Sequence, residues 1–232
     1  MSTSNLILSN EAAIEKYNAE LAERAKALSN RISAAPANVI RTKGKVFTMP
    51  DGTVNPGPLR AVVIDFTSFN SYFDGMYDAK NPKPPVCWAL GDNATLQPSK
   101  NAPKPQASAC NTCAKNEWGS APTGKGKACK NQIKLALIPS DLAAPDTSSL
   151  FTLNISPTGL KAFSAYARQV QRFLGDDALP IRTVVDIGFD PNQPFPTLTF
   201  TNIQPNNNLG VALALLKDAK EMLDREPSAA EE

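Results

Sequence analysis

The chain has 232 residues, of which 42% are apolar, and a formal net charge of +2. This length suits one good-sized domain or two small ones, and the apolar share is sufficient for a hydrophobic core. Its longest apolar runs fall far short of the roughly 20 residues that a membrane-spanning helix needs. The N-terminus lacks the basic start and the long apolar run of a signal peptide. We therefore expect a cytoplasmic globular protein without a membrane partner.

The first part of the chain predicts one helix followed by two strands. Residues 11–32 place five apolar side chains on one helical face, with charges of both signs opposite. These five are Ile14, Tyr17, Leu21, Leu28 and Ile32. Residues 39–49 and 59–66 are strand-like, and Asp51-Gly52 between them is a turn signal.

An aromatic stretch and a proline-rich segment come next. Residues 66–77 hold five aromatic side chains between polar residues and glycine, and such rings either complete a core or line a binding groove. Residues 81–126 hold too many prolines for a long helix or a central strand. We expect this second segment to be an excursion from the fold rather than a core element.

Regular structure is predicted to resume after the excursion. Four strand-like segments follow, at 132–139, 150–155, 181–189 and 196–203. Ser156-Pro157 is a strong helix start, and Gly175 ends that helix. Its apolar stripe consists of Leu160, Phe163, Tyr166, Val170 and Phe173. Residues 209–225 predict a final helix.

This order of elements predicts a mainly β fold with flanking helices. Six short strands, with one helix among the later ones, are consistent with a small Greek-key barrel of the oligonucleotide/oligosaccharide-binding kind (OB-like), here with an inserted zinc-ribbon-like loop. The expected domains are an N-terminal helix at 1–36, the barrel at 37–205 with its insertion at about 80–131, and a C-terminal helix with a short acidic tail at 206–232.

All four cysteines of the chain lie in or beside the excursion: Cys87, Cys110, Cys113 and Cys129. Their spacing, C-x22-C-x2-C-x15-C, is close to that of ribbon-type zinc sites, and four thiolates complete a tetrahedral shell without histidine. A closed shell leaves no open position for a substrate, so we expect a structural Zn²⁺ ion. Free thiols and disulfides are the alternatives, and disulfides would require an oxidising compartment.

The same segment is the basic part of the chain. From residue 80 to residue 134 there are nine lysines and two acidic residues, a local charge of +7. Lysines contact phosphates, and neighbouring aromatic rings can stack on unpaired bases. This pattern predicts a nucleic-acid surface with eight candidate residues: Lys115, Lys125, Lys127, Lys130, Tyr72, Tyr77, Trp88 and Trp118. A merely solvated loop is the alternative interpretation.

Catalysis finds little support in the sequence. The chain has no histidine, which excludes a His-based triad and a His-ligated hydrolytic zinc site. The aspartates in or beside the predicted strands match no two-metal motif, and solubility at turns and edges is their simpler role. We therefore expect a protein that is not an enzyme.

Five stretches of the chain carry a family resemblance: PPVCWALGDN, ACNTCAKNEWGSA, GKGKACK, IKLALIP and SPTGLKAF. Together they resemble phage-encoded single-stranded DNA-binding or replication-associated proteins, over about residues 60–205. Zinc within an oligonucleotide-binding fold also occurs in the single-stranded DNA-binding protein of T-even phages. That protein uses a histidine ligand, which this chain lacks. The likeness to it is therefore architectural and brings no DNA-contact residues across.

The resemblance implies a stoichiometric binder that coats single-stranded DNA exposed in phage replication or recombination. Such a protein works in the host cytoplasm, alongside replication or recombination proteins. Charge and aromatic side chains indicate the same function independently. The main alternative is a protein-interaction or structural phage factor whose zinc loop docks a protein partner. A metal-dependent nuclease is a third possibility.

Overall fold

The computed structural model describes residue 17 and residues 38–75, 83–141 and 145–227. The contacts within the chain divide it into two units, Met1–Ala37 and Asn38–Glu232. The helix predicted over residues 11–32 lies outside the described residues except at Tyr17, which is helical. The described strands and all four cysteines belong to the second unit.

In the described residues of the second unit, nine strands form one sheet. In chain order they are β1 (Val39–Lys43), β2 (Val46–Thr48), β3 (Val54–Asn55), β4 (Leu59–Tyr72), β5 (Cys87–Gly91), β6 (Lys130–Pro139), β7 (Phe151–Ile155), β8 (Thr183–Phe189) and β9 (Leu198–Pro205). The strand order is β3-β2-β1-β7-β6-β4-β8-β9, and β5 pairs with β4. Among the described strands, β1 and β7 are parallel and the other pairs are antiparallel.

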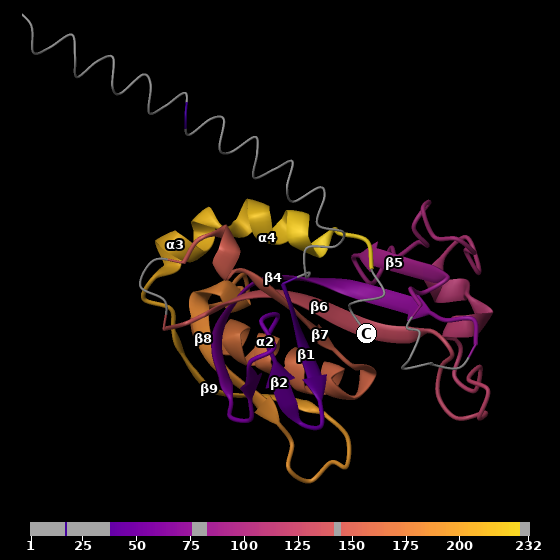
Figure 1. The fold of residues 1–232 in the computed structure, drawn as a ribbon, viewed down its shortest axis with the longest axis horizontal. Coiled ribbons are helices and arrows are strands. Elements are labelled where there is room, and N and C mark those ends of the chain that lie inside the picture. The colour runs from indigo at the N-terminus through magenta and orange to yellow at the C-terminus, as the bar shows by residue number, and fades with distance from the viewer. Residues whose placement is uncertain (1–16, 18–37, 76–82, 142–144, 228–232) are drawn as a thin grey trace, which may run out of the picture. The chain divides into compact units, whose positions relative to one another are not determined.

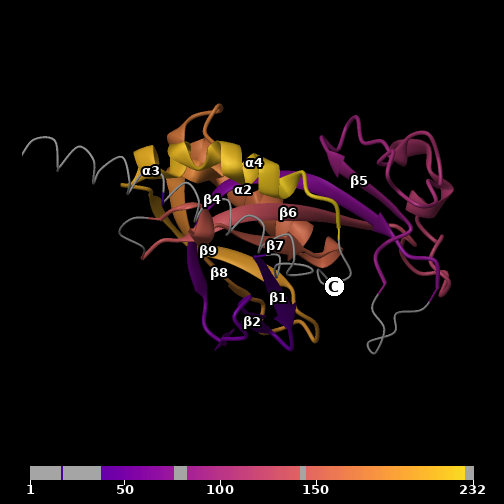
Figure 2. The ribbon, with the colours of Figure 1, turned by 45° about the horizontal axis from the view of Figure 1, so that its top comes forward.

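The sheet curls around one helix and stays open, so the fold is mainly β and barrel-like. Helix α2 (Leu160–Leu174) lies inside the curl (Figure 1). Helices α3 (Leu209–Ala214) and α4 (Leu216–Leu223) cover the opposite face of the sheet (Figure 2). Because both faces of the central strands are covered, their sequences are continuous apolar runs rather than alternating ones.

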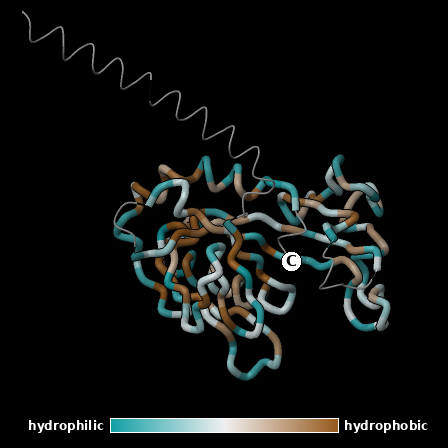
Figure 3. Tube along the Cα trace, viewed as in Figure 1, coloured by the Kyte–Doolittle hydropathy of each residue, from teal (hydrophilic) through white to brown (hydrophobic). Residues whose placement is uncertain are grey.

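Side-chain alternation along β4 and β6 divides the apolar residues into two cores. Val63, Leu135 and Leu137 belong to the core that includes Phe163, Tyr166 and Val170 of α2. The other core combines Val62, Ile64, Ala136 and Ile138 with Ala219, Met222 and Leu223 of α4. The apolar segments in Figure 3 concentrate in these layers.

The predicted strands are present, but their bounds differ. Residues 39–49 form a hairpin rather than one strand, with a turn at Gly44-Lys45 between β1 and β2. Strand β4 continues through the first half of the aromatic stretch, to Tyr72. The predicted turn at Asp51-Gly52 is confirmed by the Gly52 N–H, which donates to the Met49 carbonyl at 2.9 Å.

The proline-rich segment contributes more than an excursion. It contains β5, an edge strand that pairs with β4 alone among the described strands. Trp88 and Ala89 on β5 are buried, which corrects the expectation that this segment adds nothing to a core. The prolines before and after β5 do not prevent pairing, because an edge strand needs ladder hydrogen bonds on one side only.

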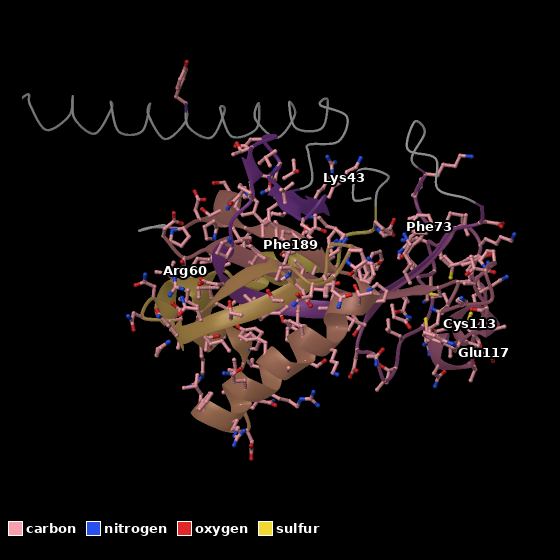
Figure 4. The ribbon with its side chains drawn as sticks, turned by 90° about the horizontal axis from the view of Figure 1, so that it is seen from below. Lys43, Arg60, Phe73, Cys113, Glu117 and Phe189 are labelled. Atoms are coloured by element: carbon pink, nitrogen blue, oxygen red, sulfur yellow. The ribbon has the colours of Figure 1, made fainter. Side chains whose placement is uncertain are left out.

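The helix predictions are confirmed in outline. A 3-10 turn, Pro157–Gly159, leads into α2, and Gly175 ends it with a φ of 111°. The predicted stripe is wrong at Phe173, which is 72% exposed because the last turn of α2 extends beyond the sheet (Figure 4). The final helix is divided at Leu215, whose N–H donates to Ala212, three residues back. No helix in the described part of the chain is long and apolar enough to cross a membrane.

Candidate functional site

The four cysteines lie in a small lobe at one end of the sheet, which we call the cysteine lobe and define as residues 67–75 and 83–133. It consists of the far half of β4, strand β5, the start of β6 and the loop between β5 and β6. Figures 1 and 2 show it at the end marked by β5. We call the rest of the second unit the sheet body.

The fold brings the four cysteines together from three segments. Cys87 begins β5, Cys129 directly precedes β6, and the C-x2-C pair spans a 3-10 turn, Cys110–Thr112. The Cys129 N–H donates to the Lys115 carbonyl at 2.8 Å, which ties the end of the loop to the turn that follows the C-x2-C pair. All four side chains line one cavity of about 10 Å³, roughly the space open to a single water molecule.

Burial and mutual proximity favour the protonated form of three of the thiols, Cys87, Cys110 and Cys129. Burial, together with the nearby Cys110, Cys113 and Cys87, raises the pKa of Cys129 to about 12. Burial also raises the pKa of Cys87 and of Cys110. A bound cation reverses this balance, because a coordinating thiol is deprotonated outright.

Two hydrogen-bond donors partly oppose the effect of burial on the pKa of Cys87 and of Cys110. The Gln106 backbone N–H faces the sulfur of Cys87, and the Asn70 side chain faces the sulfur of Cys110; each contact lowers the pKa of its thiol against the larger effect of burial. Such donors orient and stabilise ligating sulfurs in metal sites. The sequence pattern does not single out Asn70 as a partner of a cysteine, although its position two residues before Tyr72 places both on the same face of β4.

The donor set therefore suits a structural zinc, but the geometry falls short of a formed site. All four cysteines are free. Among the described residues, no group of three or more His, Cys, Asp or Glu side chains is arranged so that it could hold a metal ion as it stands. Figure 4 shows sulfur atoms gathered around the labelled Cys113. The zinc ion stays a prediction, now with a defined cavity.

Trp118 is the most exposed of the large apolar side chains in the described residues, at 82%. Its loop is closed by hydrogen bonds: the Gly119 N–H donates to the Gly126 carbonyl at 2.7 Å, and the Ala128 N–H donates to Ser120 Oγ at 2.9 Å. Gly119 and Gly126 both have positive φ, which other residues adopt at a cost. These hydrogen bonds and glycine conformations fix the loop, and the Trp118 side chain lies in solvent.

The predicted lysines surround this loop and the cavity. Lys127 Nζ donates to two neutral amides, Asn116 Oδ1 at 3.1 Å and Asn131 Oδ1 at 3.0 Å. Lys115 Nζ lies over the Tyr72 ring at 5.3 Å, and Lys130 Nζ lies over the Phe73 ring at 4.7 Å. Lys125 is exposed.

Acidic residues compensate little of this charge. Asp74 pairs with Lys104 at 2.8 Å, and the hydrogen bond from Lys104 is the main reason that the pKa of Asp74 is lowered. The whole lobe has seven lysines and three acidic residues, a net charge of +4. The lobe therefore keeps a positive surface.

The four predicted aromatic contacts have different outcomes. Trp118 is open to a ligand, whereas the Tyr72 ring is only partly exposed and lies under Lys115. Trp88 is 6% exposed and packs with Phe69 and Ala102. Its ring has no free face on which a base could stack, so we do not propose it as a nucleic-acid contact. Tyr77 lies outside the described residues.

Comparison with known proteins adds no relative. No family model, no curated protein and no solved structure matches this chain.

Proposed function

We propose that the protein binds single-stranded DNA through the cysteine lobe. The observation that carries the proposal is the exposed Trp118 on a hydrogen-bonded loop of the most basic segment of the chain. An aromatic face in solvent stacks on unpaired bases, at about 1–3 kcal/mol per base. A paired duplex offers no such faces along its length, so a single strand is the favoured ligand.

The lysines supply the electrostatic part of this binding. Lys115 lines the cavity, Lys125 and Lys127 belong to the loop between β5 and β6, and Lys130 begins β6. Lys127 is held by neutral amides that leave its charge intact. Phosphate contacts release counterions, so affinity must fall as salt rises. A lobe with a net charge of +4 supports this dependence.

A structural Zn²⁺ ion bound by Cys87, Cys110, Cys113 and Cys129 belongs to the same proposal. Four thiols around one small cavity, with donors facing two of the sulfurs, support it. The ion would hold the C-x2-C turn, β5 and the start of β6 together, with no open coordination position and hence no catalytic role.

The remaining expectations are part of the proposal as well. We propose a role in phage DNA replication or recombination, in the host cytoplasm and without enzymatic activity. The OB Greek-key barrel with a zinc-ribbon-like insertion is the finer fold that this role favours. The curled open sheet supports a barrel-like β fold at the coarser level.

The test is a titration with oligo(dT), followed by tryptophan fluorescence. The two tryptophans of the chain, Trp88 and Trp118, both lie in the cysteine lobe, and the exposed one should be quenched by stacked bases. Trp118→Ala should weaken binding by about 1–3 kcal/mol. Phe173→Ala is the matched control, because Phe173 is also a largely exposed aromatic residue, but on the sheet body.

A double charge reversal completes the test of DNA binding. Lys125→Glu with Lys127→Glu should weaken binding and reduce the salt dependence, whereas Lys161→Glu with Lys217→Glu on the sheet body should not.

Metal analysis of the purified protein should find one zinc per chain. No binding of oligo(dT) at about 50 mM salt would refute the proposed function. Capture of a specific protein without DNA affinity would favour the docking factor, and cleavage of single-stranded DNA with Mg²⁺ would favour the nuclease.

A further inference from the structure

A second group of cations and an exposed aromatic ring occurs at the end of the sheet body where β1 turns into β2. The turn consists of Gly44 and Lys45, both with positive φ (66° and 57°), between the paired residues Lys43 and Val46. The Lys45 Nζ donates to the Pro191 carbonyl at 3.2 Å. This bond fastens the turn to the loop between β8 and β9, residues 190–197. Figures 1 and 2 show the turn and the loop at the same end of the sheet.

The β8–β9 loop is stiff and presents a phenylalanine. Three of its eight residues are proline, which restricts the backbone. The Asp190 N–H donates to the Thr197 carbonyl at 2.9 Å and closes the loop. Phe195 is 44% exposed, although the loop around it is closed and anchored. At the base of the loop, the Phe47 and Phe189 rings are in contact, with centroids 4.5 Å apart.

Lys43 and Lys45 supply the positive charge of the turn. Lys43 is exposed, and Lys45 donates to a neutral carbonyl rather than to a carboxylate. The Asp190 carboxylate accepts the Asn192 N–H at 2.9 Å within its own loop. Residues 41–47 and 190–197 together hold three basic residues and one acidic residue. Figure 4 views the molecule from this end and labels Lys43 and Phe189.

Lys45 is an unusual residue for its backbone conformation. In a two-residue hairpin turn the positive φ positions favour glycine, asparagine or aspartate, and a lysine adopts this conformation at a cost. Strain of this kind is kept where the side chain has a role. Here the conformation brings the ammonium group to the β8–β9 loop.

We propose that the β1–β2 turn and the β8–β9 loop form a second contact site for single-stranded nucleic acid, with Lys43 and Lys45 at phosphates and Phe195 stacked on an unpaired base. The inference rests on the proposed function and extends it, because one strand would then contact the sheet body as well as the cysteine lobe. Cations beside an exposed aromatic ring on a stiff loop are what such a strand requires.

A tryptophan placed at position 195 tests the stacking directly. In a Trp118→Phe background, Phe195→Trp should be quenched by a long oligo(dT), while Phe173→Trp in the same background should not. Phe195→Ala should weaken binding of the otherwise unaltered chain about fivefold or more. Far-UV circular dichroism confirms that each variant is folded.

The charges are tested by Lys43→Glu with Lys45→Glu, against the control pair Lys161→Glu with Lys217→Glu. Loss of two phosphate contacts should lower affinity about tenfold and flatten the slope of log affinity against log salt by about 1.4. If the unaltered chain binds no oligo(dT), the proposed function and this inference both fail. If it binds through Trp118, but the introduced tryptophan is not quenched and the lysine variant matches its control, the second site alone is refuted.

Discussion

The sheet body and the cysteine lobe are stabilised in different ways. The body buries two apolar cores, one on each face of its sheet. Among the described residues, the lobe has two small clusters: Phe69, Trp88 and Ala102 in one, and Ala89, Leu96 and Cys110 in the other. Segments with so little buried apolar surface usually need cross-links or metals. The body is therefore stabilised mainly by hydrophobic burial, and we propose that the lobe depends on its cysteines.

The largest effect should follow from a cavity in the body. Phe163 is 2% exposed and contacts the rings of Phe66 and Phe200, with centroids 5.0 and 5.5 Å away. Phe163→Ala should lower the free energy of unfolding by about 3–5 kcal/mol. Urea denaturation followed by far-UV circular dichroism measures it. A loss below about 1 kcal/mol would show that this core is not the main source of stability.

Loss of a cysteine should affect the lobe and spare the body. Cys113→Ser should abolish zinc binding and weaken binding of oligo(dT) about tenfold or more, because the basic loop loses its anchor. In a Trp118→Phe background, emission of the buried Trp88 should shift to longer wavelength while the far-UV transition of the body remains. Global unfolding of this variant would break the comparison, since the lobe would then belong to the core.

The polar network of Asp186, Asn202 and Arg60 on the sheet body should contribute less to stability than Phe163 or the cysteines. Burial raises the pKa of Asp186, but hydrogen bonds from Asn202 and Arg60, together with the Arg60 charge, outweigh it and lower the pKa overall. The carboxylate therefore stabilises the fold above its unfolded pKa of about 3.9, and this contribution is lost as pH falls through the lower, folded pKa.

Asp186→Asn should accordingly lower the free energy of unfolding by about 1 kcal/mol at neutral pH. The Arg60 and Asp186 side chains form an ion pair at 2.8 Å, and both are partly solvated, which limits the effect. Denaturation at neutral pH and well below pH 4 checks it, and the difference from the unaltered chain should shrink in acid. A constant difference at all pH values would point to lost packing instead.

The smallest effect should be a gain in stability at the β1–β2 turn. Lys45→Gly relieves a positive φ and should stabilise the hairpin by up to about 1 kcal/mol, partly offset by loss of the bond to Pro191. The same change should weaken oligo(dT) binding if the turn contacts the strand. Thermal melting and titration, measured on one preparation, separate the two effects. A destabilised variant would mean that the Lys45 contact outweighs the backbone strain.

Local sequence predicted much of the sheet body. The apolar runs of β4 and β6 and the start and end signals of α2 are local, so all three elements were found, although β4 continues to Tyr72, beyond its predicted end at residue 66. The exposure of Phe173 was not predictable in this way, because periodicity assigns a face without telling where the neighbouring sheet ends. Strand β5 was likewise hidden among prolines, since only pairing with β4 makes it a strand.

For the site, spacing identified the four cysteines, and charge identified the lysines. Neither spacing nor charge could tell which of the two tryptophans is exposed, since Trp88 directly follows Cys87 and Trp118 follows Cys113 closely. The ladder of β4 and β5 buries Trp88 against Phe69, whereas hydrogen bonds across the 117–126 loop leave Trp118 in solvent.

The sequence by itself determined the mainly β character, the cysteine ligand candidates and the position of the positive charge, because composition, periodicity and spacing are local properties. Only the tertiary structure decided that the four cysteines share one cavity, that Trp118 rather than Trp88 is open to a ligand, and that Lys45 meets the β8–β9 loop. These facts depend on contacts between residues far apart in the chain, which strand pairing and the packing of the sheet create.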